Sequence, residues 1–282
     1  MGIWYAAPSR SMSQMRRWRL AVSSNSLSQL SLPGAASVVR ENGYAGMALH
    51  IQSARVDRCS VEPTEPAIAS AAEACTAAGL SITGLSFDPD PMEPAEVAHA
   101  MDLTALARAP HIRLRPKSLD SRPYAVAFDQ TVRCCEAYVE AASSRGIKVV
   151  LQQHWGTIAP SATQLFKILS RFDARAIGCI YDAGSMILEG YEHYRIGLEV
   201  LGPYVSDVHV KNARFFRSES GVWDWEWSPL SDGLIDLRAL FRALRDAGYA
   251  GWITLQDETV GPTAQDMLRE SKALLEQAMD ES

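Results

Sequence analysis

Short apolar runs alternate along the chain with longer segments in which apolar residues recur every three or four positions. A short run bounded by turn residues is typical of a buried strand, and the longer spacing is typical of an amphipathic helix. The pattern predicts eight strands, at residues 19–23, 45–50, 81–86, 111–115, 148–152, 177–182, 205–210 and 251–256. It predicts eight helices, at residues 29–41, 66–78, 94–108, 124–144, 161–172, 191–201, 236–247 and 262–279.

The strict alternation of strand and helix predicts an α/β fold. Eight strand-helix units within residues 18–282 fit a closed (β/α)8 TIM barrel, which takes about 250 residues. An open doubly wound sheet is the rival architecture, but it normally has a glycine-rich turn after its first strand, and residues 24–28 contain no glycine. We therefore predict one barrel domain at 18–282. Residues 1–17 precede any periodic pattern and are expected to form an N-terminal extension that could be mobile.

Composition and charge narrow the class of partner. The chain has 282 residues, of which 47% are hydrophobic, and its net charge of −6 is spread without long runs of one sign. No basic footprint of a nucleic-acid binder is present, so a small-molecule partner is expected. No run approaches the roughly 20 apolar residues of a membrane span, and the N-terminus lacks the order of a secretory signal. We expect a cytoplasmic protein with no membrane partner.

The five cysteines do not suggest a metal or redox site. Their number is odd and no two of them have the CxxC spacing. This pattern argues against a disulfide framework and against a thiolate metal site.

Four polar residues stand where four of the predicted strands end. Gln152, Asp182, His209 and Gln256 each close an apolar run. If the strands are parallel, their carboxyl ends meet at one end of the sheet, which is where α/β folds place their active sites. The four side chains are therefore expected to share one site.

Around these positions the chain resembles the xylose isomerase-like TIM barrels, a family of sugar-phosphate isomerases, ketose 3-epimerases and related dehydratases. The segment 151–156 (L-Q-Q-H-W-G) resembles the family's L-E-N-H-x-G, 181–184 (Y-D-A-G) its D-x-G, and 209–212 (H-V-K-N) its H-x-K-D. The segments 231–236 (S-D-G-L-I-D) and 247–253 (A-G-Y-A-G-W-I) resemble its G-x-G-x-x-D and G-Y-x-G-x-x. The resemblance runs from Arg19 to the C-terminus and implies the barrel fold.

The resemblance also implies a metal site. In the family, Glu, Asp, His and Glu from the fifth to eighth strands hold a divalent ion. Asp182 and His209 match this set, whereas Gln152 and Gln256 stand at the glutamate positions. An amide oxygen can coordinate a metal but brings no negative charge, so three formal negative charges fall to one. We expect a weak site for Mn²⁺ or Mg²⁺ formed by Gln152, Asp182, His209 and Gln256.

The same two positions carry the family's proton transfer. Its two glutamates flank the substrate carbon, and an amide cannot accept a proton at neutral pH as a carboxylate can. Gln152 and Gln256 therefore stand at catalytic positions without the usual chemistry. His154 is the candidate base that remains, and Glu258, two positions beyond Gln256, is a candidate carboxylate after the last strand. Glu258 is expected on the same side as Gln256 only if the strand continues that far.

Several cationic residues are candidates for substrate binding. His50 ends the second predicted strand, and Arg115, just before Pro116, is expected to end the fourth and could meet an anionic group or form an ion pair on the rim. Lys211 retains the lysine of the family's H-x-K-D. It could hold a positive charge over an oxyanion or a phosphate, or be a solvated loop residue.

Aromatic residues are the other candidates. Trp155 follows His154, and Trp225 is the centre of an alternating segment at 223–227 (W-D-W-E-W) in the longest predicted loop. Such side chains could cap the pocket and stack on a sugar. They could equally form a hydrophobic plug or a contact between subunits.

Three functions stay open on the sequence. The first, which the retained polar residues favour, is a divergent sugar isomerase, epimerase or related lyase acting on a small polyol, keto-sugar or sugar derivative. The second is a carbohydrate-binding pseudoenzyme that has lost the two-glutamate chemistry. The third is a partner subunit, for which a homo-oligomer is plausible. The alternative to any site is a buried network in which Asp182 and His209 pair and the two glutamines complete their hydrogen bonds.

Overall fold

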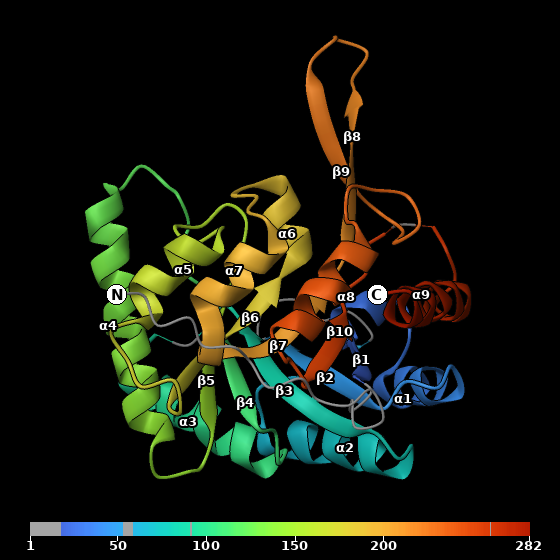
Figure 1. The fold of residues 1–282 in the computed structure, drawn as a ribbon. Coiled ribbons are helices and arrows are strands. Elements are labelled where there is room, and N and C mark those ends of the chain that lie inside the picture. The colour runs from blue at the N-terminus through green and yellow to red at the C-terminus, as the bar shows by residue number, and fades with distance from the viewer. Residues whose placement is uncertain (1–17, 53–58, 91, 260) are drawn as a thin grey trace.

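The computed structural model describes residues 18–52, 59–90, 92–259 and 261–282. The predicted extension at residues 1–17 lies outside the described residues. The described chain forms the predicted (β/α)8 barrel, with strand order β1-β10-β7-β6-β5-β4-β3-β2 around a closed parallel sheet (Figure 1). None of the described helices is both long enough and apolar enough to cross a membrane.

Eight parallel strands make the barrel wall. They are β1 (Arg19–Ser23), β2 (Gly46–Gln52), β3 (Ser81–Asp88), β4 (His111–Leu114), β5 (Lys148–Gln152), β6 (Ile177–Asp182), β7 (Val205–Val210) and β10 (Trp252–Leu255). Pairing of β1 with β10 closes the barrel, with Arg19 opposite Trp252 and Val22 opposite Leu255. Because all eight strands run the same way, their carboxyl ends open at one rim.

Helices cover the outside of this wall. They are α1 (Leu32–Glu41), α2 (Glu65–Ala77), α3 (Pro94–Leu106), α4 (Tyr124–Ala142), α5 (Ala162–Leu169), α6 (Ala183–Leu188), α7 (Tyr194–Leu201), α8 (Leu237–Asp246) and α9 (Ala264–Asp280), with single 3₁₀ turns at Ser24–Leu27 and Gly202–Tyr204. In α8, Leu240, Phe241 and Leu244 are buried at the spacing that forms one apolar face. The helices α1 and α2 end before Gly43 and Gly79, whose φ angles of 76° and 71° favour glycine.

Several helices begin at a side-chain cap. Ser161, Asp182, Asp236 and Thr263 each accept a hydrogen bond from the backbone N–H three residues further on. Such a cap satisfies one of the free N–H groups of the first turn. The cap at Asp182 fixes one oxygen of its carboxylate at the end of β6.

The structure differs from the predicted elements at several places. The strand β3 extends to Asp88, β4 ends at Leu114 rather than at residue 115, and β10 ends at Leu255 rather than at residue 256. The helix predicted at 191–201 is α7 alone, and a separate short helix, α6, follows β6 directly. Strand ends depend on neighbouring strands, which a sequence pattern does not contain.

The segment predicted as the longest loop is a β-hairpin instead. The strands β8 (Asn212–Arg217) and β9 (Trp223–Ser228) pair antiparallel, with Phe215 opposite Trp225. The hairpin projects away from the barrel beyond the other elements (Figure 1). The alternation of tryptophan and acidic residues at 223–227 is the period-two pattern of a strand, which explains the pairing.

The barrel interior contains buried polar groups. Asp207 on β7 is fully buried, and it accepts hydrogen bonds from the Thr254 hydroxyl at 3.1 Å and from the Val208 backbone N–H at 2.7 Å. His111 on β4 is also buried and stands over Gly84, where an added Cβ would lie 2.1 Å from the imidazole Nε2. Burial lowers the pKa of His111 to about 4.

The buried His111 should make stability depend on pH. The neutral ring is favoured in the folded chain, whereas an unfolded histidine binds a proton below about pH 6.5. The stability contributed by the neutral ring is therefore present above the unfolded pKa and is lost as pH falls toward the folded value. Between pH 7 and pH 5 this amounts to roughly 2 kcal/mol.

Between pH 7 and pH 5 we expect His111→Gln to lose less unfolding free energy than the wild type, by roughly 2 kcal/mol. The measurement is urea unfolding of both proteins at pH 7 and at pH 5, because groups that titrate in both proteins cancel in the difference. An equal loss of unfolding free energy in the two proteins would contradict the assignment.

Candidate active site

A cavity of about 810 Å³ opens at the carboxyl ends of the strands. All the sequence-predicted site residues except Asp182 and Trp225 line it, namely His50, Arg115, Gln152, His154, Trp155, His209, Lys211, Gln256 and Glu258. Asp182 lies just beneath the wall, fully buried, in contact with two of the lining residues. The structure therefore brings the predicted residues of β5, β6, β7 and β10 to one place.

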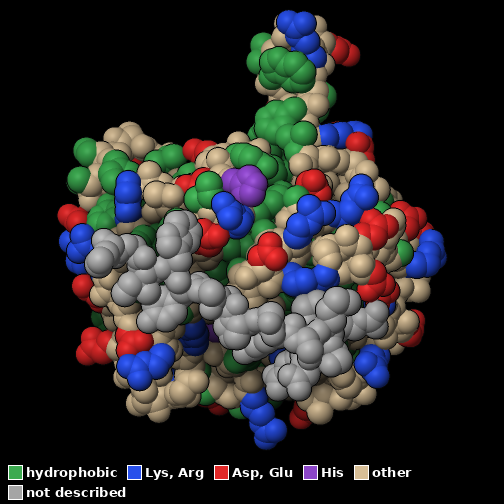
Figure 2. All heavy atoms as spheres, in the orientation of Figure 1, with side chains coloured by type: hydrophobic (Ala, Val, Ile, Leu, Met, Phe, Trp, Pro, Cys, Tyr) green, Lys and Arg blue, Asp and Glu red, His purple; other side chains and the backbone are tan. Residues whose placement is uncertain are grey.

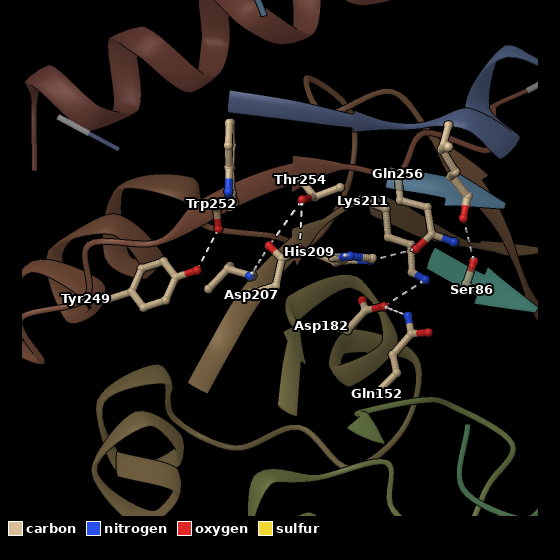
Figure 3. A network of polar contacts seen from close by, with 12 residues as sticks. Ser86, Gln152, Asp182, Asp207, His209, Lys211, Tyr249, Trp252, Thr254 and Gln256 are labelled. Carbon is tan, nitrogen blue, oxygen red and sulfur yellow. Dashed lines mark hydrogen bonds and ion pairs between the residues drawn. The ribbon is translucent and has the colours of Figure 1, made fainter. Parts of the chain in front are cut away.

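Asp182 is the centre of the site. Its Oδ2 atom accepts a hydrogen bond from the Gln152 amide Nε2 at 2.7 Å and lies 3.0 Å from the Lys211 ammonium (Figure 3). Its Oδ1 atom accepts the backbone N–H of Ser185 at 2.8 Å. Burial alone would raise the pKa of Asp182, but the charge of Lys211, His209 nearby and the Ser185 hydrogen bond outweigh it and lower the pKa below its ordinary value.

Lys211 is not the solvated loop residue that a lysine after a strand often is. It is 2% exposed, and its ammonium lies 5.0 Å from the ring centroid of Trp227 on β9. It follows His209 by two positions, so both side chains leave β7 on the same side. Its aliphatic stem passes over Gly184, where an added Cβ would lie 2.1 Å from the Lys211 Cγ.

A second chain of contacts runs from β7 to the end of β10. The His209 ring Nδ1 lies 3.1 Å from the Gln256 Oε1, and the Gln256 amide Nε2 donates to the Glu258 Oε1 at 2.7 Å. The amide oxygen can only accept, so His209 donates from Nδ1. Glu258 reaches Gln256 although β10 ends at Leu255, so the contact does not require the strand to continue.

These residues, as arranged, do not fit a divalent metal ion. The one carboxylate, Asp182, already has an ammonium against it, and Gln152 turns its amide nitrogen toward the carboxylate. The oxygen of Gln256 is directed at His209. Within the described residues no cluster of three or more His, Cys, Asp and Glu side chains is placed to hold a metal. Binding of Mn²⁺ or Mg²⁺ through Gln152, Asp182, His209 and Gln256 stays a prediction, and it would require Lys211 to move.

His154 lies at the edge of the cavity in a defined orientation. Its Nδ1 atom is 2.6 Å from the backbone oxygen of Trp155, so Nδ1 carries the proton and Nε2 has a free lone pair. Burial, together with the charge of Lys211, lowers the pKa of His154 to about 4. The ring is therefore neutral at pH 7 and able to accept a proton.

The aromatic residues form one cluster beside His154. The Trp155 ring stacks on the His154 ring at a centroid distance of 5.8 Å and meets Trp225 edge-on at 5.2 Å. Trp225 packs in turn against Trp227 at 5.1 Å. Only Trp155 of these three lines the cavity, and Trp225 packs behind it.

The opposite side of the cavity is made by β2, β3 and β4. The His50 ring Nδ1 is 2.9 Å from the Ser86 hydroxyl, and the Arg115 guanidinium donates to Asp88 at 3.1 Å. Both predicted cationic residues thus line the mouth, and Arg115 forms the ion pair on the rim that the sequence left open. Arg115 lies one residue beyond β4.

A buried ion pair on this side, between Arg113 and Asp90, was not predicted from the sequence. Arg113 is buried and its Nη1 is 3.7 Å from Asp90, an ion pair at the cavity wall. Burial lowers the pKa of Arg113 and raises that of Asp90. The available signal was the acidic segment 88–90 directly after the third strand, opposite two arginines two positions apart on the fourth.

The space-filling view shows a face on which side chains of both charge signs are mixed, with hydrophobic side chains at the base of the hairpin (Figure 2). A polar cavity with an aromatic wall suits a small hydroxylated ligand better than an apolar one. No large field of one sign is present on this face, in line with the expected small-molecule partner.

Comparison with known proteins supports this picture at the level of the family. A curated relative, the inosose dehydratase of Geobacillus thermodenitrificans, is 26% identical over 132 residues, which cover 42% of this chain and 43% of that protein. The chain thus matches less than half the length of that relative.

Two solved structures share the fold along nearly the whole chain. A xylose isomerase-like TIM barrel protein from Mycobacterium smegmatis, in complex with magnesium, has a TM-score of 0.69 at 16% identity and covers 93% of this chain and 96% of its own. The 3-keto-D-glucoside 4-epimerase of E. coli has a TM-score of 0.70 at 14% identity and covers 93% of this chain and 100% of its own. The family model described as xylose isomerase-like TIM barrel matches residues 36–278. The resemblance seen in the sequence is confirmed, and the chain belongs to the xylose isomerase-like TIM barrel family.

Proposed function

We propose that this protein is a sugar-modifying enzyme that removes a proton next to the carbonyl of a small keto-sugar or keto-polyol. The observation that carries the proposal is that one cavity holds a buried ammonium, Lys211, and two groups able to take a proton, His154 and Glu258. The names of similar proteins, an inosose dehydratase and a 3-keto-glucoside epimerase, support a keto-sugar or keto-polyol as substrate.

The first step is proton abstraction. The lone pair on His154 Nε2, or the carboxylate of Glu258, takes the proton from the carbon next to the carbonyl, and the electron pair of the C–H bond moves to the carbonyl oxygen. The resulting enolate carries negative charge on that oxygen. A buried ammonium stabilises such a charge more strongly than a solvated one, because the surrounding dielectric is low. Lys211 has this role.

The second step decides the class of reaction. Return of a proton to the opposite face of the same carbon gives an epimer. Return of the proton to the former carbonyl carbon, with loss of the proton from the hydroxyl on the deprotonated carbon, gives an isomer. Loss of a hydroxyl from the next carbon, which takes up a proton from the acid form of a proton carrier and leaves as water, gives an elimination. His154 follows β5 and Glu258 follows β10, so a substrate between them would meet one proton carrier from each side. Of the three classes, epimerisation or elimination agrees with the names of the similar proteins.

The two glutamines have a positioning role in this scheme. Gln152 holds Asp182, and Gln256 links His209 to Glu258. Neither amide can carry the proton at neutral pH. The chemistry that the family assigns to glutamates at these positions is taken by the residues two positions further along each segment.

Exchange of solvent deuterium tests the proposal. In D₂O we expect the protein to introduce one deuterium into a keto-polyol such as an inosose, or into a 3-keto-glucoside, measured by mass spectrometry. His154→Gln, Glu258→Gln and Lys211→Met should each slow the exchange by about a hundredfold or more where that residue is used, since a positioned acid or base contributes about 10²–10⁴-fold. The exposed residues His99 and Glu199 offer matched controls, and His99→Gln and Glu199→Gln should leave the rate unchanged.

A different result would be binding of these sugars without deuterium exchange, with an affinity that His154→Gln and Glu258→Gln leave unchanged. That result would contradict the proposed enzymatic activity and favour the carbohydrate-binding pseudoenzyme.

The hairpin supports a second, structural role in self-association. Its side chains Phe215, Val222 and Trp223 are 41%, 64% and 68% exposed, on a two-stranded sheet that projects from the barrel (Figure 1). A projecting apolar hairpin with two free strand edges is a typical site of protein contact. We infer that it packs against a second copy of this chain.

Light scattering tests the self-association. We expect a dimer or larger species for the wild type, shifted toward the monomer by the double substitution Phe215→Ser/Trp223→Ser. Tyr191 is 64% exposed and lies between α6 and α7, outside the hairpin, so Tyr191→Ser is the matched control and should not change the mass. A monomeric wild type at micromolar concentration would contradict the role.

A further inference from the structure

Lys211 places a buried positive charge next to Asp182. Its ammonium is 3.0 Å from Asp182, and the two residues are 2% and 0% exposed. It also lines the cavity, as do its neighbours His209 and Gln152 (Figure 3). The positive charge beside Asp182 thus belongs to a side chain of the protein itself.

The surrounding chain is built to hold this lysine. Gly184 leaves the space through which the stem passes, since an added Cβ would lie 2.1 Å from Lys211 Cγ and 2.5 Å from its backbone oxygen. The backbone N–H of Ser185, in the first turn of α6, donates to the other oxygen of Asp182. The Trp227 ring lies 5.0 Å from the ammonium. Three independent features therefore position one cation.

The charges of the four side chains Asp182, Lys211, Gln152 and Gln256 agree with one monovalent cation at Asp182 and disagree with a divalent one. Asp182 and Lys211 together are neutral, and Gln152 and Gln256 add no charge. A glutamate at residue 152 would place a second carboxylate against Asp182, where the Gln152 amide now donates at 2.7 Å. A divalent ion entering here would find one carboxylate that is already neutralised and an ammonium that repels it.

We infer that the ammonium of Lys211 is the permanent cation of this site and replaces the divalent metal ion. The inference concerns the same cavity as the proposed function but does not depend on turnover. Its tests are metal content, metal affinity and thermal stability, so it can fail or hold whether or not deuterium exchange is found.

The wild-type protein gives the first test. After purification without chelator, elemental mass spectrometry should find well under one metal ion per chain. Millimolar Mn²⁺ or Mg²⁺ should change the Tm by less than about 1 °C, because a ligand that does not bind the folded state cannot stabilise it. Near-stoichiometric metal, or a Tm increase that His209→Ala abolishes, would overturn the inference.

Restoring the acidic ligands gives the second test. The variant Gln152→Glu/Gln256→Glu places carboxylates beside Asp182 and His209 while Lys211 stays. Adding Lys211→Met removes the ammonium and retains an unbranched side chain over Gly184. Mn²⁺ should bind the triple variant at least about tenfold more tightly than the double variant, measured by isothermal titration calorimetry. Equal affinity in the two variants, including no binding by either, would overturn the inference.

Lys148 provides the matched control. It is also a lysine whose stem crosses a glycine, since an added Cβ at Gly178 would lie 2.9 Å from its Cε, but it begins β5 at the opposite end of the barrel. Combining Lys148→Met with the two glutamate substitutions should leave Mn²⁺ affinity at the level of the double variant. A gain equal to that of Lys211→Met would mean that loss of any nearby positive charge suffices, and would also overturn the inference.

Discussion

A buried lysine and a buried aspartate within hydrogen-bonding distance constrain everything around them. Removing one member of such a pair leaves an uncompensated charge in the interior, at a cost of about 3–5 kcal/mol. Asp182 and Lys211 are such a pair, at 0% and 2% exposure. The carboxyl end of β6 and the carboxyl end of β7 are therefore tied together at the point where the barrel opens.

The neighbouring residues follow from that pair. A second carboxylate at residue 152 would compete for a single ammonium, whereas the Gln152 amide donates to Asp182 and completes its hydrogen bonds. Gly184 must lack a side chain because the lysine stem occupies the space. Gln152, Gly184 and Lys211 are thus parts of one arrangement around Asp182.

The sequence predicted the fold well because the fold depends on patterns along the chain. Apolar runs with polar residues at their ends are enough to place Gln152, Asp182, His209 and Gln256 at one rim, and the structure puts them there. The environment of Lys211 could not be read in the same way. Its burial depends on Gly184 and Trp227, which lie far from it along the chain or on another strand, and contacts of this kind have no local pattern.

The β8–β9 hairpin was predicted as a loop. The segment 223–227 has the period-two alternation of a strand, but its length between two barrel units suggested a loop, and the structure pairs it with residues 212–217. The strand β3 likewise extends beyond its predicted end to Asp88, which lines the cavity. Local patterns identify strands, and partners decide how far they extend.

In the proposed mechanism the two proton carriers lie further along the chain than the two glutamines. His154 lies two residues beyond Gln152, and Glu258 lies two residues beyond Gln256, so each follows its glutamine toward the mouth of the barrel. Glu258 is exposed, whereas His154 is half-buried under Trp155. A substrate held between them would stand above the Lys211–Asp182 pair, with one carbon face toward the sheltered imidazole and the other toward a carboxylate open to water. This asymmetry would let the two faces exchange protons with solvent at different rates, which is a property that two equivalent buried glutamates would not provide.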